Sequence, residues 1–201
     1  MAKNPTLVLA SRNPGKIREF QTLLGPLGIG LEAFTGPPAL EDGETFTENA
    51  IRKARGAALH SSRPALADDS GLEVEALGGQ PGVHSHRFAG EGADDQANNQ
   101  ELLRRLAGIE GEKRSARFVA VLALATPDGQ IWTWRGETAG RILTQPQGEM
   151  GFGYDPLFLS EDLGVSFAQA DAVAKNRVSH RGRACQAFLA DLPGILADLF
   201  A

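Results

Sequence analysis

The feature of this sequence that most constrains its fold is a short apolar run that ends in two adjacent acidic residues, Asp68 and Asp69. Residues 64–67 have the composition of a buried strand, and Ser70-Gly71 after the acids is a turn signal. The pattern predicts a strand that delivers both carboxylates to a sheet edge and then turns. Adjacent carboxylates repel each other in a partly dry site, so they need a cation, and Mg²⁺ suits their oxygen atoms. The alternative is that the two acids only cap a turn.

The composition limits the class of protein. With 201 residues, 42% of them hydrophobic, the chain can bury one sizeable core, so we expect a single α/β domain over residues 1–201 that has two lobes. The net charge of −5 and the absence of a long basic run argue against nucleic-acid or membrane partners. The single cysteine, Cys185, excludes an internal disulfide and is expected in the core. The sequence has no signal-peptide or membrane-span pattern, which predicts a cytoplasmic protein.

A polar loop near the N-terminus has the pattern of an anion-binding site. Residues 6–10 read as an apolar strand, and residues 17–27 carry apolar side chains at helical spacing. Backbone N–H groups at the start of such a helix, with a lysine in its first turn, can bind a phosphate. A plain connection between strand and helix is the alternative. The candidate phosphate-binding residues are Ser11, Arg12, Asn13, Pro14, Gly15 and Lys16.

A second helix is predicted from about Thr45 to His60. Thr45 and Glu48 have the spacing of a capping box, and alanines recur on one face of this segment. Polar and charged side chains lie within about a turn and a half of each other, so an acid and a cation can reach one site. The alternative is an ordinary solvated helix face. These side chains belong to Glu48, Asn49, Arg52 and Lys53.

The middle of the chain predicts two long antiparallel strands. Residues 117–125 form a β-rich run, residues 126–130 are a hairpin turn signal, and residues 131–137 form the return strand. Trp132 and Trp134 share one face of that strand and indicate a packing or subunit-contact surface.

A glycine-rich and aromatic stretch, residues 148–158, suits a flat ligand. Glycines let the backbone approach a ring while Phe152 or Tyr154 stacks on it, and Asp155 is held extended before a proline. A purine fits this chemistry, and a tight structural turn is the alternative. Further along, residues 175–183 concentrate positive charge where a final helix begins. That position aims Lys175, His180 and Arg181 at an anion or a carbonyl group.

Taken together, these segments resemble the inosine/xanthosine triphosphate pyrophosphatase family. The matching stretches are residues 10–16, 45–50 with 53–54, 67–72, 151–156 and 179–182, in the family's order over nearly the whole chain. The resemblance implies an elongated α/β fold, with a mixed sheet of long central strands flanked by helices and two lobes around an active-site cleft. It also implies a homodimer and Mg²⁺-dependent hydrolysis of deaminated purine nucleoside triphosphates (ITP, dITP and XTP) to the monophosphate and pyrophosphate.

The resemblance also implies residue roles. Asp69, with Asp68 or Glu41, is expected to hold Mg²⁺, and Asp69 is expected to orient or deprotonate the attacking water. Lys53 and the loop at residues 11–16 are expected to hold the triphosphate. A purine 6-oxo group would accept hydrogen bonds that the amino group of adenine cannot accept, so ATP should be rejected. The remaining expected substrate contacts are Ser70, Phe152, Gly153, Tyr154, Asp155, Lys175, His180 and Arg181.

The chain departs from the family pattern beside Glu41. Some members have two consecutive acids there, whereas this chain has Leu40 before Glu41, and a one-residue shift on an extended segment turns a side chain to the other face. Two other functions fit parts of the pattern. One is a metal-dependent phosphatase, although an aspartyl nucleophile and its acid usually lie two residues apart. The other is a non-catalytic sensor of purine nucleotides.

Overall fold

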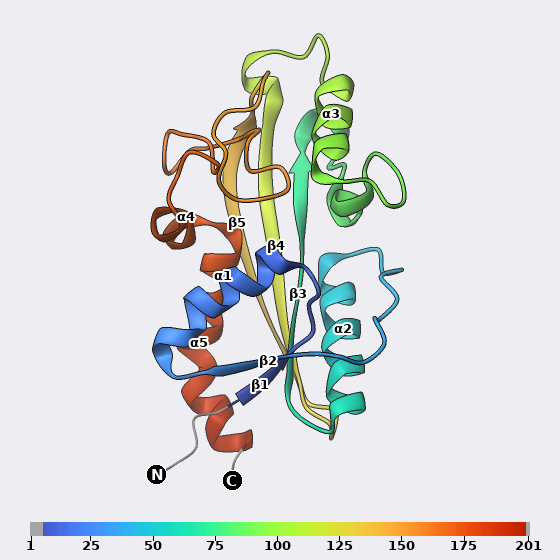
Figure 1. The fold of residues 1–201 in the computed structure, drawn as a ribbon, viewed down its shortest axis with the longest axis vertical. Coiled ribbons are helices and arrows are strands. Elements are labelled where there is room, and N and C mark those ends of the chain that lie inside the picture. Colours follow the sequence, from blue (N-terminus) through green and yellow to red (C-terminus); the bar gives the residue numbers. More distant parts are fainter. Residues whose placement is uncertain (1–5, 200–201) are drawn as a thin grey trace. The chain divides into compact units, whose positions relative to one another are not determined.

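The computed structural model describes residues 6–199 as a six-stranded sheet with helices (Figure 1). The strand order is β2-β1-β3-β4-β5-β6. β1 pairs in parallel with β2 and β3, and β5 pairs antiparallel with β6, so the predicted mixed sheet is confirmed. The strands are β1 (Thr6–Leu9), β2 (Gly30–Ala33), β3 (Ala65–Val74), β4 (Ser115–Ala125), β5 (Ile131–Ile142) and β6 (Phe158–Ser160). The α-helices are α1 (Pro14–Leu24), α2 (Phe46–Ser61), α3 (Asp95–Arg105), α4 (Ala172–Val178) and α5 (His180–Leu199).

Short 3₁₀ helices fill several of the connections, at Gly25–Leu27, Glu75–Leu77, Gly82–Arg87 and Gly111–Arg114. No helix in the described part of the chain is both long enough and apolar enough to cross a membrane. Of the predicted domain over residues 1–201, the first five and the last two residues lie outside the described range.

α2 begins as the sequence predicts, whereas α1 begins at Pro14, inside the stretch 11–16 that the sequence predicts as a loop. Asn13 caps α1 through its side chain, and Pro14 occupies the first turn, where its missing N–H costs nothing. Thr45 and Glu48 form the predicted capping box of α2, because each side chain accepts a hydrogen bond from the other residue's backbone N–H. The alanine face of α2 is fully buried, which allows close packing.

The prediction of a turn at Ser70-Gly71 is wrong. β3 continues without a break from Ala65 to Val74, and a 3₁₀ helix follows it. β3 lies between β1 and β4 in the sheet, so both of its edges have strand neighbours that hold it extended. Asp68 and Asp69 therefore lie within an internal strand and not at a turn.

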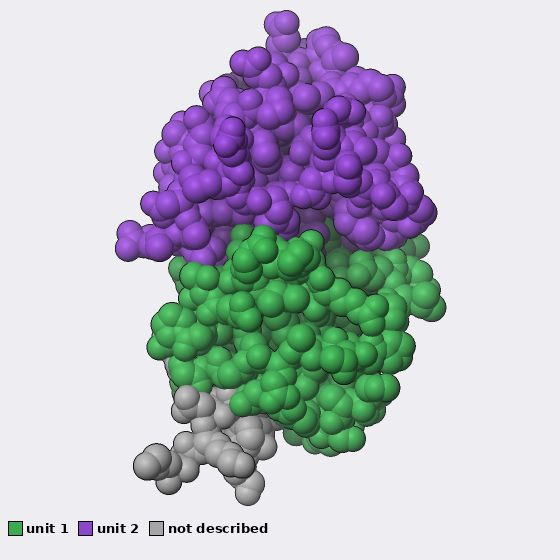
Figure 2. Space-filling view, viewed as in Figure 1, with its two compact units in different colours: residues 1–69, 121–135, 184–201 green, residues 70–120, 136–183 purple. Residues whose placement is uncertain are grey.

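The chain divides into two compact units, shown in different colours in Figure 2. Unit 1 comprises residues 1–69, 121–135 and 184–201, and unit 2 comprises residues 70–120 and 136–183. The long strands β3, β4 and β5 each contribute residues to both units. Consequently Asp69 belongs to unit 1 and Ser70, the next residue, to unit 2.

Each unit has its own apolar core. In unit 1, the ring centres of Trp134 and Phe188 of α5 lie 5.0 Å apart with their planes at 68°, and the Trp134 indole N–H donates to Asp191 at 2.8 Å. Cys185 is fully buried, as predicted. In unit 2, aromatic rings from β4, β6 and the following loop pack together, with Phe118 at 4.6 Å from Phe158.

Candidate active site

The two acids of β3 are bound by lysines from two different helices. Asp68 and Asp69 are 2% and 5% exposed. Lys16 of α1 places its Nζ 2.5 Å from Asp68 Oδ1, and Lys53 of α2 places its Nζ 2.7 Å from Asp69 Oδ1. Consecutive side chains of a strand point to opposite faces of the sheet, which is why each acid has its own lysine. The adjacent pair therefore does not act as one bidentate unit.

Asp69 has a second partner on the same helix as Lys53. The amide nitrogen of Asn49 lies 3.3 Å from Asp69 Oδ2, and Asn49 and Lys53 are four residues apart on one face of α2. The Asn49 amide oxygen also accepts the backbone N–H of Gly43 at 2.9 Å. Sequence reasoning noted Asn49 as a polar residue but did not select it as a site residue. Its four-residue spacing from Lys53 is the signal that points to it.

The loop before α2 brings Glu41 to the same lysine. Glu41 Oε1 lies 3.0 Å from Lys53 Nζ. Nearby, a Cβ added to Gly43 would lie 2.6 Å from the Asn49 side-chain oxygen, so only glycine lets this loop approach α2 so closely. Glu41 therefore pairs with the same lysine as Asp69, despite the departure from the family pattern at Leu40.

Burial and opposite charge act together on these groups. Burial raises the pKa of Asp69 above its ordinary value, although Lys53 and Lys16 favour its charged form. Burial alone would lower the pKa of Lys53, but the carboxylates of Asp69, Glu41 and Asp68 outweigh it and raise that pKa. The lysine thus stays protonated. Burial thus makes the Asp69 carboxylate easier to protonate than an exposed aspartate.

This cluster suits a divalent cation. Oxygen atoms of Asp69 and Glu41 converge within 3.0 Å of one positive group, the ammonium of Lys53. Among the described residues there is no group of three or more His, Cys, Asp or Glu arranged to hold a metal. Mg²⁺ usually takes one or two carboxylates and completes its shell with water and phosphate oxygens, so two converging carboxylates fit it.

Residues 11–16, which form a short loop and the first turn of α1, are ordered by their own polar groups. Asn13 Oδ1 accepts the backbone N–H groups of Gly15 at 2.8 Å and Lys16 at 3.1 Å, and Ser11 Oγ accepts that of Asn13. Arg12 donates to the Gly36 carbonyl at 2.7 Å. The expectation of open N–H groups at this helix start therefore needs correction, because Asn13 already uses two of them. Of the six candidates in the loop, Lys16 is the one bound to an acid of β3.

A second group of predicted residues meets in unit 2. Arg181 is 1% exposed, and its guanidinium donates to Ser70 Oγ at 2.8 Å. Lys175 Nζ lies 2.6 Å from Asp155 Oδ2 and 5.0 Å from the centre of the Phe152 ring. Arg181 Cζ lies 5.9 Å from the same ring. Two cations thus surround Phe152, and a buried ion pair holds one of them in place.

Two glycines allow this arrangement. A Cβ added to Gly182 would lie 1.8 Å from the Asn176 carbonyl oxygen, so glycine is needed where α5 begins against α4. Gly151 has φ +79°, and a Cβ there would lie 2.1 Å from Asp155 Oδ2. That oxygen instead accepts the Phe152 backbone N–H at 2.9 Å. Gly151 and Gly182 therefore set the positions of the side chains around Phe152.

Two further predicted residues of unit 2, Tyr154 and His180, are buried. Tyr154 is 5% exposed, and its hydroxyl donates to the Ser85 carbonyl at 2.8 Å, while burial raises its pKa well above the usual range. His180 stacks on Phe118, with ring centres 4.7 Å apart and planes at 12°. Phe152 is the more exposed of the two aromatic candidates. It is therefore the better candidate for stacking on a ligand.

Comparison with known proteins identifies the family. A sequence model described as the Ham1 family matches residues 7–191. The chain belongs to the Ham1 family. It is 50% identical over 192 residues to a Thermus thermophilus protein named dITP/XTP pyrophosphatase, covering 94% of this chain and 92% of that one.

Solved structures of the Ham1 family have the same fold. A HAM1 protein from Coxiella burnetii is 40% identical with a TM-score of 0.86, covering 94% of this chain and 99% of that one. A nucleoside-triphosphatase named dITP/XTP pyrophosphatase from Mycobacterium abscessus is 40% identical with a TM-score of 0.74, covering 92% and 98%. The similarity extends across both units, because the family match runs from β1 into α5.

Proposed function

We propose that this Ham1 family chain is a pyrophosphatase that hydrolyses dITP, XTP and ITP to the nucleoside monophosphate and pyrophosphate. The observation that carries the proposal is the pairing of two buried carboxylates in β3 with lysines of α1 and α2. The lysines can bind a triphosphate, and the carboxylates can bind the divalent cation that accompanies it. Relatives such as the Thermus thermophilus protein, which is 50% identical and named dITP/XTP pyrophosphatase, support it.

Residues of unit 1 hold the triphosphate and the water in this proposal. Lys16 and Lys53 exchange their carboxylate partners for phosphate oxygens, and the loop at residues 11–16 adds further polar contacts. Asp69 accepts the proton of the attacking water. The water oxygen bonds to the α-phosphorus, the bond from that phosphorus to the oxygen bridging to the β-phosphate breaks, and pyrophosphate leaves with that oxygen.

Asp69 and Glu41 are the proposed holders of Mg²⁺, because their oxygen atoms already converge on a cation. Bound Mg²⁺ supplies charge neutralisation at the phosphate oxygens. Asp68, which is bound by Lys16, supports the phosphate-binding lysine in this scheme. Asn49 keeps the Asp69 carboxylate oriented through its other oxygen.

Residues of unit 2 recognise the purine in this proposal. Phe152 stacks on the base, while Lys175, His180 and Arg181 with nearby backbone N–H groups donate toward its 6-oxo edge. Adenine presents an amino group there and would leave these buried donors unpaired, which disfavours ATP by a factor on the order of 10⁴. Asp155 holds Lys175, and Ser70 is bound to Arg181. GTP shares the 6-oxo group and is therefore the harder nucleotide to exclude.

Four further predictions from the sequence belong to the same proposal. A single domain, an elongated shape with an active-site cleft between two lobes, a homodimer and a cytoplasmic location stay predictions. The homodimer is tested by measuring molar mass in solution.

The proposed activity is tested by product analysis. The purified protein is incubated with ITP, XTP, dITP, GTP and ATP in the presence of Mg²⁺, and pyrophosphate and phosphate are measured separately. Pyrophosphate release from the first three is the expected result. Release of phosphate alone would favour the metal-dependent phosphatase. Nucleotide binding without any product would favour the sensor.

A further inference from the structure

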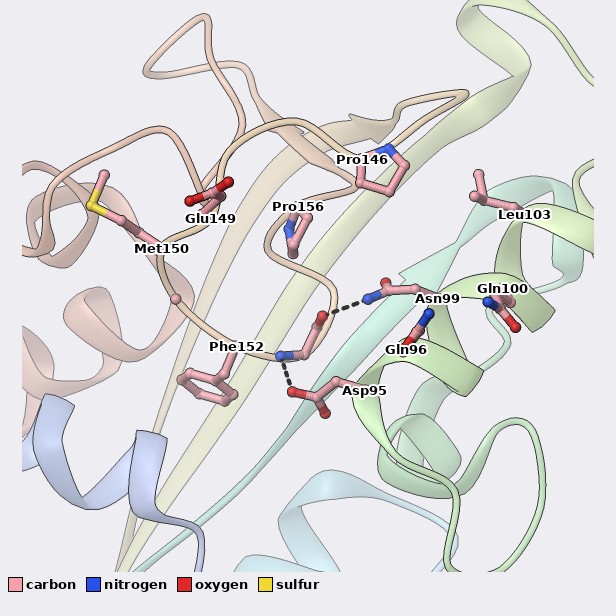
Figure 3. Close-up of a pocket in the computed structure, with 12 residues that line it drawn as sticks. Asp95, Gln96, Asn99, Gln100, Leu103, Pro146, Glu149, Met150, Phe152 and Pro156 are labelled. Carbon is pink, nitrogen blue, oxygen red and sulfur yellow. Dashed lines mark hydrogen bonds between the residues drawn. The ribbon is translucent and has the colours of Figure 1, made fainter.

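Helix α3 forms hydrogen bonds with both backbone polar groups of Gly153, its N–H and its carbonyl. Asp95 Oδ2 accepts the Gly153 N–H at 2.7 Å, and the Asn99 side-chain N–H donates to the Gly153 carbonyl at 2.9 Å (Figure 3). Asp95 and Asn99 are four residues apart, so they lie on one face of α3. Gly153 directly follows Phe152, the ring proposed to stack on the purine.

Residues 146–156 form the loop that contains Gly153. This loop and α3 also line a pocket of about 340 Å³ in unit 2. Side chains do not fill this space, so the loop lacks close packing on the side that faces the pocket. The hydrogen bonds from Asp95 and Asn99 are therefore links that hold the loop at a fixed distance from α3. Lining residues include Asp95, Asn99 and Leu103 of α3 and Pro146, Met150 and Phe152 of the loop.

The loop is tied on both sides of Gly153 by other contacts. Asp155 binds the Phe152 N–H and the Lys175 ammonium. The Tyr154 hydroxyl donates to Ser85, within the buried core. Gly153 itself has φ +61° and no side chain, so nothing but its backbone can fix its position. Motion at Gly153 would therefore shift the adjacent Phe152 ring.

We propose that Asp95 and Asn99 are positioning residues for purine recognition: they hold Gly153 so that Phe152 is placed to stack on the base. The proposal rests on the proposed function, since it assumes that Phe152 contacts the purine. Neither residue touches the substrate in this scheme. Both act through the loop.

Four variants separate hydrogen bonding from packing. Asn99→Asp has nearly the same shape but places an acceptor against the Gly153 carbonyl, and Asp95→Ala removes the acceptor for the Gly153 N–H. Asp95→Asn keeps an oxygen acceptor and should preserve the wild-type behaviour. Gln100→Ala is the matched control, because Gln100 lines the same pocket from α3 and is exposed. Circular dichroism and the Tm show whether each variant is folded.

The loop can be observed directly because Tyr154 is the only tyrosine in the chain. Protein labelled with 3-fluorotyrosine should give one ¹⁹F resonance, which reports the residue next to Gly153. We expect Asn99→Asp and Asp95→Ala to shift, split or broaden this resonance, and Asp95→Asn and Gln100→Ala to leave it unchanged.

Kinetics with ITP provide the second measurement. In Asn99→Asp and Asp95→Ala, kcat/KM should fall by about tenfold, mainly through a higher KM, because each variant loses one hydrogen bond that pre-forms the base contact. The value for ATP should fall by a similar factor, because an aromatic ring stacks on adenine as well as on a 6-oxo purine. Asp95→Asn should retain most of the wild-type kcat/KM.

Each outcome decides a separate question. Wild-type ¹⁹F spectra and wild-type KM in both folded disruptive variants overturn the proposal, as does a loss of Tm that comes with neither change. A changed spectrum with an unchanged KM shows that the side chains hold the loop but do not position the base contact, which also overturns it. A wild-type protein that does not hydrolyse ITP overturns the proposed function, while the spectra still report whether α3 holds the loop.

Discussion

Lys53 Nζ lies 2.7 Å from Asp69 Oδ1 and 3.0 Å from Glu41 Oε1, so one ammonium group bridges the two carboxylates that are best placed for a metal. The same lysine is the proposed partner of the triphosphate. Binding of the nucleotide would therefore draw Lys53 away from the acids and leave them available for a cation. In the proposed function, this exchange would make phosphate binding and cation binding cooperative.

The first prediction concerns that exchange. Lys53→Met should bind Mn²⁺, used as a probe for Mg²⁺, at least about tenfold more tightly in the absence of nucleotide, because it removes a positive charge next to both carboxylates. Arg52→Met is the control, since Arg52 is on the same helix and pairs with the exposed Asp42. Isothermal titration calorimetry measures both affinities. An affinity in Lys53→Met equal to that of the control would contradict the exchange.

The second prediction concerns turnover. Asp69→Asn should fold and lose most ITP hydrolysis, because it removes both a cation ligand and the proton acceptor. Asp68→Asn should reduce activity through the loss of the partner that holds Lys16. Asp128→Asn, in the exposed hairpin turn after β4, should keep wild-type rates. Near-normal turnover in folded Asp69→Asn would remove Asp69 from the mechanism.

A third prediction follows from the raised pKa of Asp69. The folded state binds a proton at this group more tightly than the unfolded state does, so its contribution to stability is fully present below the ordinary pKa of 3.8 and is lost as pH rises through the higher folded pKa. The neutral Asn side chain resembles protonated Asp69. In this variant Lys53 still has the Glu41 carboxylate as an ion-pair partner. Asp69→Asn should therefore have a higher Tm than wild type at pH 7, with the gain shrinking as pH falls toward 4. Thermal denaturation across this pH range measures it.

Sequence reasoning predicted local features of the chain better than contacts between distant residues. The capping box at Thr45 is a local signal, and the structure has it, whereas residues 14–16 of the predicted loop form the first turn of α1. The turn predicted at Ser70-Gly71 failed because the neighbours of β3 in the sheet, which hold it extended, are distant in sequence. Asn49 was overlooked as a site residue for the same reason. Its role depends on facing Asp69, twenty residues later, across α2 and β3.

The fourth prediction concerns a buried arginine that the sequence did not reveal. Arg114 is 6% exposed, and its guanidinium donates to the carbonyls of Ile142, Leu143, Leu106 and Ile109 at 2.7 to 3.0 Å. Arg114→Met would leave these buried acceptors without their donor, so we expect a loss of unfolding free energy of about 2–4 kcal/mol. Arg117→Met, which removes a more exposed ion pair with Glu73, should cost under about 1 kcal/mol. Urea denaturation of both variants measures the difference, and equal losses would contradict the prediction.

The last prediction concerns base choice, and it depends on Arg181. This side chain is buried beside Phe152 and bonded to Ser70, so in the proposal it donates to the purine and not to phosphate. Arg181→Ala should then lower kcat/KM for ITP and XTP while changing the already low value for ATP much less, because adenine has an amino group and no acceptor at position 6. The ratio of the ITP and ATP values should fall at least about tenfold. If Arg181 instead bound phosphate, kcat/KM would fall by a similar factor for every triphosphate, since all share that group.

Ser70→Ala is the companion variant: it removes only the partner of Arg181, so it should lower the ratio less than Arg181→Ala does. An unchanged ratio in Arg181→Ala would exclude Arg181 from base recognition.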